Sequence, residues 1–110
     1  EDEYTRMLID KLRVIHPSVD KIVKELRFFE GDKSYTIDKK YVFLCKRDPK
    51  TGQQYHDNQL ILVLIHEISH ALCPDVGHTD TFHKINDGLL EIAIEMGLYD
   101  DSIQVSNYCE

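Results

Sequence analysis

Basic residues are scarce in this sequence, and their scarcity limits the partners that its surface can bind. Its 110 residues include 13 Lys and Arg against 20 Asp and Glu, which gives a formal net charge of −7. Nonspecific binding of nucleic acid needs clustered Lys and Arg that neutralise phosphates. The pairs Lys39-Lys40 and Lys46-Arg47 are too small for that role. We therefore expect DNA to be a partner only indirectly, or through segments outside this chain.

Long apolar runs and a cysteine framework are also missing. The longest apolar run, residues 60–65, is far shorter than the roughly 20 residues of a membrane-spanning helix. The chain opens Glu1-Asp2-Glu3, which is unlike a signal peptide. Three scattered cysteines with no CxxC pair are too few for a disulfide scaffold, so we expect Cys45 and Cys73 to be small buried side chains. These absences favour an intracellular protein in the cytoplasm or nucleus, with no membrane contact through this chain.

The remaining composition is that of a globular protein. Hydrophobic residues make up 42% of the sequence and charged residues 30%, with no internal repeat and no linker rich in Pro or Gly. A chain of this length has room for one hydrophobic core. We expect a single domain over residues 1–110, present as a monomer.

Apolar residues at helical spacing predict four helices. The first covers about residues 4–15 and ends before Pro17, and Ser18 is a candidate cap for the second. The third starts at Asp57 or Asn58 and runs to about residue 72, with its first half buried on every side. The fourth starts at residue 79 or 80 and is closed by Gly97. Its predicted inward residues are Phe82, Ile85, Leu89, Ile92, Ala93 and Met96.

Strands are expected between the second and third helices. Residues 34–37 and 41–45 are rich in β-branched and aromatic residues and predict a hairpin or one long bent strand. Residues 27–29 fit either the last turn of the second helix or a short strand. In the tail, Ile103 and Val105 are candidate docking residues. The fold class is therefore α+β, with about four helices and a small antiparallel sheet.

The third helix carries the residues with chemical potential, in the run His66-Glu67-Ile68-Ser69-His70. Histidines four positions apart on a helix face the same point, and zinc accepts imidazole nitrogen at about 2.0–2.1 Å. Glu67 lies beside them and can take a proton from water at such a site. A chance His-Glu-x-x-His is expected on an exposed polar helix, whereas this one follows six apolar residues, where unpartnered polar groups would be costly.

A catalytic zinc site needs a third protein ligand. His78 is favoured, because it follows Gly77 just after a short loop that can fold back toward the metal. Glu91 is the main alternative, but it lies on the polar stripe of the fourth helix. The less favoured alternatives are His83, Glu95 and Cys73.

The two motifs together are similar to the active-site signature of the WLM and SprT-like (Spartan-like) zinc metallopeptidases. That signature has HExxH, a short loop, a third His and an aromatic residue four positions later, as in His66–His70 followed by His78 and Phe82. The segments 34–45 and 107–109 resemble the compact WLM-like proteins of large DNA viruses. The resemblance covers roughly residues 30–110. It implies a minimal zincin-like fold, a peptidase activity, repair of DNA–protein crosslinks, and a location inside an infected host cell.

The expected function is thus hydrolysis of peptide bonds with Zn²⁺ held by His66, His70 and His78 and with Glu67 as general base. The substrate is a protein or peptide, and residues 41–45 are the expected sheet edge beside the metal that receives it as an added strand. Tyr41, Tyr55 or Tyr108 could stabilise the oxyanion of the tetrahedral intermediate, and Cys109 could cap the metal. A purely structural role is favoured for each of them. The alternatives are a non-catalytic zinc module that binds a partner and a zinc hydrolase of a small amide.

Overall fold

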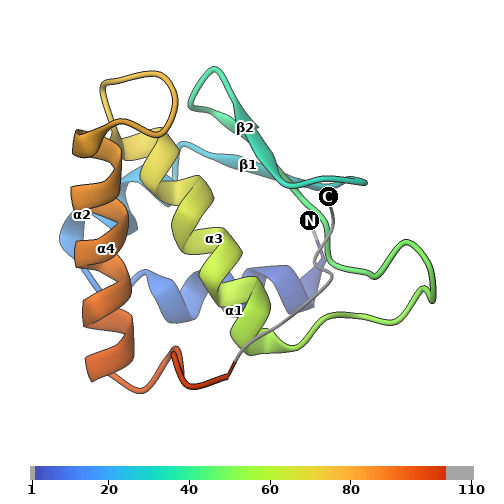
Figure 1. Ribbon diagram of the computed structural model, residues 1–110. Helices are drawn as coiled ribbons and strands as arrows, with labels where there is room; N and C mark the ends of the chain where they lie inside the picture. The colour runs from blue at the N-terminus through green and yellow to red at the C-terminus, as the bar shows by residue number, and fades with distance from the viewer. Residues whose placement is uncertain (1, 104–110) are drawn as a thin grey trace.

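The computed structural model describes residues 2–103, in which four helices and three strands form the α+β fold predicted from the sequence (Figure 1). The helices are α1 (Glu3–Leu12), α2 (Pro17–Val23), α3 (Asp57–Leu72) and α4 (Asp80–Glu95). The strands are β1 (Arg27–Glu30), β2 (Tyr35–Ile37) and β3 (Tyr41–Leu44). None of these helices is long and apolar enough to span a membrane.

The helix starts differ in part from the sequence expectation. Pro17 is the first residue of α2, and His16 caps it by accepting a hydrogen bond from the Ser18 backbone N–H, so Ser18 is not the cap. The residue that precedes α3 is His56, which makes no capping hydrogen bond through its side chain, so neither Asp57 nor Asn58 is the cap. For α4 the expectation is confirmed: Thr79 is the cap and Gly97 follows the last turn with a φ of 75°.

The sheet is mixed rather than purely antiparallel. Its strand order is β1-β3-β2, with β1 parallel to β3 and β2 antiparallel to β3. The hairpin of β2 and β3 is confirmed, but the expectation that residues 41–45 form an edge is wrong. The ambiguous segment 27–30 is a strand, and it covers the side of β3 that β2 leaves open. Among the described strands, β2 is therefore an edge strand, on the side of β3 opposite β1.

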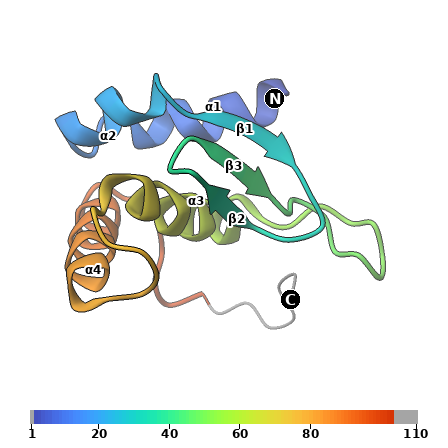
Figure 2. The same cartoon turned by 90° about the horizontal axis from the view of Figure 1, so that it is seen from above.

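Helix α3 is the centre of the molecule. It contacts α1, α2 and α4 as well as β2 and β3 (Figures 1 and 2). Five of its six residues from Leu60 to Ile65 are buried, as expected for a helix enclosed on all sides. This enclosure fixes the direction in which the second half of α3 emerges toward the sheet and the loop before α4.

Most of the residues predicted to be buried are buried, but two of them are exposed. Phe82, Leu89 and Ala93 of α4 are buried, but Met96 is 48% exposed because it follows the last turn of the helix. Ile103 is half exposed rather than docked, and Val105 lies outside the described residues. Cys73 and Cys45 are both buried, as expected, and Cys73 is a free thiol.

Candidate metal centre

Three imidazoles converge where α3 emerges from the core. His66 and His70 lie one turn apart on α3, and His78 comes from the loop that leads to α4. The Nε2 atom of His78 lies 3.1 Å from the Nε2 atoms of both His66 and His70. Nitrogens that bind one zinc ion tetrahedrally at about 2.0–2.1 Å lie about 3.3 Å from one another. The three histidines are therefore close enough to hold a metal ion.

The loop that presents His78 is fixed at both ends. Gly77 adopts a φ of 84°, which is unfavourable for other residues and lets the chain turn back before His78. The Thr79 hydroxyl donates to Asp75 at 2.9 Å and accepts from the Phe82 backbone N–H, so it joins the loop to the first turn of α4. A short sequence thereby holds a loop-borne imidazole beside two helix-borne ones.

Lys39 ties the β2–β3 turn to the same loop. Its ammonium donates to the carbonyl oxygens of His70 at 2.8 Å and of Asp75 at 3.0 Å. Asp38 and Lys39 both have a φ of 54°, a strained conformation for residues with a side chain. Such strain persists where surrounding contacts hold it in place, and here the contacts are those of the Lys39 side chain.

Phe82 forms an apolar base under the three imidazoles. Its ring is 1% exposed and stacks on the His70 ring with a centroid separation of 4.3 Å. The rings of His66 and His78 each lie 5.0 Å from it. Phe82 restricts the orientations of the imidazoles and keeps water from their inner side.

The electrostatics of the cluster favour neutral imidazoles. Burial, together with the neighbouring His70, His78 and His83, lowers the pKa of His66 from 6.5 to about 4. Burial also lowers the pKa of His70, and His78 and Lys39 add to that shift. Neutral imidazole is the form that binds metal, so at neutral pH these side chains need lose no proton to bind one.

Glu67 lies on the core side of the cluster. It is 3% exposed, and burial raises the pKa of its carboxyl group, while a hydrogen bond from Thr36 opposes the shift. The Thr36 hydroxyl, on β2, donates to Glu67 Oε1 at 2.8 Å. A buried carboxyl with a raised pKa has a stronger affinity for a proton than an exposed one, as a general base requires.

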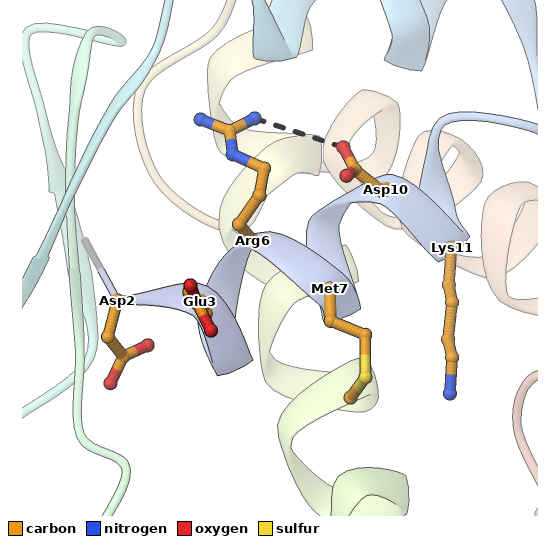
Figure 3. A pocket seen from close by; sticks show the side chains of 6 residues that line it. All are labelled: Asp2, Glu3, Arg6, Met7, Asp10 and Lys11. Atoms are coloured by element: carbon orange, nitrogen blue, oxygen red, sulfur yellow. Dashed lines mark ion pairs between the residues drawn. The ribbon is translucent and has the colours of Figure 1, made fainter.

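These residues line one cavity of about 520 Å³, which we call the histidine pocket. Its walls come from the β2 hairpin, the second half of α3 and the loop before α4, and they include His66, Glu67, His70 and His78. Figure 3 shows a second cavity, of about 740 Å³, which we call the α1 hollow. It is lined by Asp2 and by five residues of α1, among which Arg6 and Asp10 lie 4.0 Å apart as an ion pair.

The other candidate ligands do not join the cluster in the described part of the chain. Glu91, Glu95 and His83 are exposed on α4, and Cys73 is buried away from the three nitrogens. Tyr41 and Tyr55 do not line the histidine pocket, and Tyr108 and Cys109 lie outside the described residues. Sequence reasoning missed Thr36 and Lys39, because both reach the site from 31 positions away along the chain.

Comparisons with known proteins find relatives in large DNA viruses. The chain is 48% identical over 91 residues to uncharacterized protein 136R of Invertebrate iridescent virus 6, and 45% identical over 89 residues to uncharacterized protein 042R of Invertebrate iridescent virus 3. It is 33% identical over 120 residues to uncharacterized protein R325 of Acanthamoeba polyphaga mimivirus. These matches cover 80%, 80% and 98% of this chain.

The same matches span only part of each relative: 51% of 136R, 56% of 042R and 61% of R325. No family model and no solved structure matches the chain. The chain is therefore similar to parts of viral proteins whose names state no activity, and the case for a function depends on the site itself.

Proposed function

We propose that this chain is a zinc metallopeptidase of the WLM/SprT-like kind. His66, His70 and His78 would hold the zinc, and Glu67 would be the general base. The observation that carries the proposal is the convergence of three Nε2 atoms within one cavity that also contains a buried carboxylate. The order of these residues along the chain, HExxH followed by a third His and Phe82, supports the same conclusion.

Zinc at this site would supply a Lewis acid that makes water more acidic and a substrate carbonyl more electrophilic. While the oxygen of the attacking water bonds to the carbonyl carbon, Glu67 would accept a proton from that water. It would pass that proton to the nitrogen of the scissile bond, so that the C–N bond breaks and a free amine leaves. Phe82 and the walls around it would hold the imidazoles in place during these steps.

The position of β2 favours a peptide substrate over a small amide. Ser34, Tyr35 and Thr36 line the histidine pocket, and β2 is paired only with β3 among the described strands. An extended peptide can add to such an edge through main-chain hydrogen bonds, with its scissile bond beside the histidines. We therefore assign to β2 the substrate-binding role that the sequence suggested for residues 41–45.

The rival role is a non-catalytic zinc module. A structural site closes all four positions with protein ligands, whereas three nitrogens and an adjacent carboxylate leave one position for water or substrate. The buried Glu67 carboxylate is also costly for a protein that only binds a partner, since burial disfavours its charged form. These two features support a hydrolase.

The proposal is tested by incubating zinc-loaded protein with an unfolded protein substrate, and with free and DNA-crosslinked DNA-binding proteins. We expect cleavage fragments to form in the zinc-loaded sample. Their formation should stop when a chelator is added and resume when zinc is restored. Glu67→Gln should keep the metal and the fold but lower the rate of hydrolysis about 10²–10⁴-fold, because an amide cannot accept the proton of water. Near wild-type hydrolysis by Glu67→Gln would contradict the role of Glu67.

A further inference from the structure

Thr36 makes a direct contact with the candidate general base. It is the middle residue of the edge strand β2, and its side chain points from the sheet toward α3. Its hydroxyl donates to Glu67 Oε1 at 2.8 Å and lies 3.3 Å from the Glu67 carbonyl oxygen. The single hydroxyl proton goes to the nearer acceptor, the carboxylate, and the backbone carbonyl of Glu67 is the more distant alternative.

The hydroxyl is held in that place from two directions. Thr36 is paired with Val42 in the antiparallel ladder, and Val42 is fully buried in the core. At the end of the hairpin, the Lys39 ammonium is bound to the carbonyl oxygens of His70 and Asp75. A shift of the hairpin relative to the end of α3 would therefore break the Lys39 contacts and displace the buried Val42 from the core.

The contact defines how the two carboxylate oxygens of Glu67 differ. Oε1 accepts a hydrogen bond from the Thr36 hydroxyl, which leaves Oε2 as the oxygen that we assign to proton transfer. Partial rotation of the carboxyl group about the Cγ–Cδ bond would turn Oε2 away from the proton that it accepts, and such a displacement lowers the rate of a positioned proton transfer. A hydrogen bond to Oε1 restricts this rotation.

We propose that Thr36 is a positioning residue, whose hydroxyl holds the Glu67 carboxylate in the orientation that proton transfer needs. The inference rests on the proposed peptidase function. Thr36 itself touches neither metal nor reacting atoms in this role, and acts only through Glu67. Thr36 lies on the strand that would receive the substrate, so the same element would position both the peptide and the base.

The test compares Thr36→Val, which keeps the shape but removes the hydroxyl, with Thr36→Ser, which keeps the hydroxyl. Thr51→Val, in an exposed loop, is the matched control for the chemical change. We expect Thr36→Val to lower kcat about tenfold to a hundredfold with KM and zinc affinity nearly unchanged. Thr36→Ser should restore most of kcat, and Thr51→Val should match the wild type.

A second measurement does not depend on activity. Crystal structures of the metal-free wild type and of Thr36→Val should show one Glu67 side-chain conformer in the former and several in the latter. A single unchanged conformer in Thr36→Val, or a full kcat in that variant, would overturn the inference while the loss of hydrolysis in Glu67→Gln kept the proposed function. Absence of chelator-sensitive hydrolysis in the wild type would overturn both.

Discussion

The histidine pocket and the α1 hollow differ in size, but the more instructive difference is in what lines them. The α1 hollow is the larger, about 740 Å³ against 520 Å³, but its lining comes from one helix and the residue that caps it (Figure 3). The histidine pocket is lined by a hairpin, a helix and a loop that meet from three directions. Chemistry needs groups that converge on one point and are held there, and only the second arrangement provides them.

Removal of the Phe82 ring should produce the largest difference in unfolding free energy between a change at the histidine pocket and a change at the α1 hollow. Phe82→Ala should lower the free energy of unfolding by about 3–5 kcal/mol, because it leaves a cavity under the three imidazoles. Met7→Ala in the α1 hollow should cost less than about 1 kcal/mol, because Met7 is 40% exposed. Urea unfolding of the metal-free proteins measures both values, and equal costs would show that the two regions are equally packed.

Loss of a ligand should have the next largest effect. His78→Ala should weaken zinc binding about a hundredfold, or about 2.7 kcal/mol, since two protein ligands remain. Glu91→Ala should leave zinc affinity within about twofold, because Glu91 is exposed and lies outside the cluster. Competition with a chromophoric chelator measures both, and a larger loss in Glu91→Ala would refute the ligand set.

Acid should destabilise the two regions over different pH ranges. The pKa of His66 is about 4 in the folded chain and 6.5 without burial, so the unfolded chain binds more protons between these values. The metal-free protein should therefore lose about 1–2 kcal/mol as the pH falls from 6.5 to 4, after allowance for partial exposure. At the α1 hollow, the hydrogen bond from Lys46 lowers the pKa of Asp2, and its contribution is lost only below 3.8.

Urea unfolding in the presence of chelator at pH 7, 5 and 3.5 measures the pH range over which each region loses stability. His66→Gln should flatten the fall in stability between pH 7 and 5, whereas His56→Gln, a change at an exposed position, should leave it unchanged. Because the pKa of His70 is also lowered, part of the slope should remain in His66→Gln, and an undiminished slope would assign the effect to a group other than His66.

The smallest effect is expected from the ion pair on α1. Arg6→Ala removes the pair with Asp10, whose side chains are 43% and 52% exposed. We expect a change in the free energy of unfolding below about 0.5 kcal/mol, with zinc affinity and hydrolysis unaltered. A marked loss of either activity or metal would show that the α1 hollow contributes to the site.

The sequence predicts those features of the molecule that depend on neighbouring residues. The apolar run from Leu60, followed by polar residues at a four-residue spacing, was enough to predict α3 and the direction of His66 and His70. Thr79 and Gly97 mark the ends of α4 because capping is decided within one turn. The hairpin of β2 and β3 is equally local, with a tight turn between two short strands.

Features that depend on distant pairing could not be predicted in the same way. Nothing in the composition of residues 27–30 shows that they pair in parallel with β3, and this pairing moves β3 to the centre of the sheet. For the same reason the partners of Glu67 and His70 on the hairpin were missed. Periodicity predicts which elements form, whereas sheet order follows from how the helices leave space for the strands.

The closeness of the three ligands along the chain has a consequence for the order of folding. His66 and His78 are 12 positions apart, whereas Thr36 and Glu67 are 31 positions apart. Closing a short loop costs less entropy and is faster than bringing distant strands together. An ion could thus bridge the end of α3 and the start of α4 before the sheet assembles, and serve as an early cross-link of the nascent chain. Glu67, the proposed general base, would acquire its hydrogen bond from Thr36 only afterwards, when the hairpin docks.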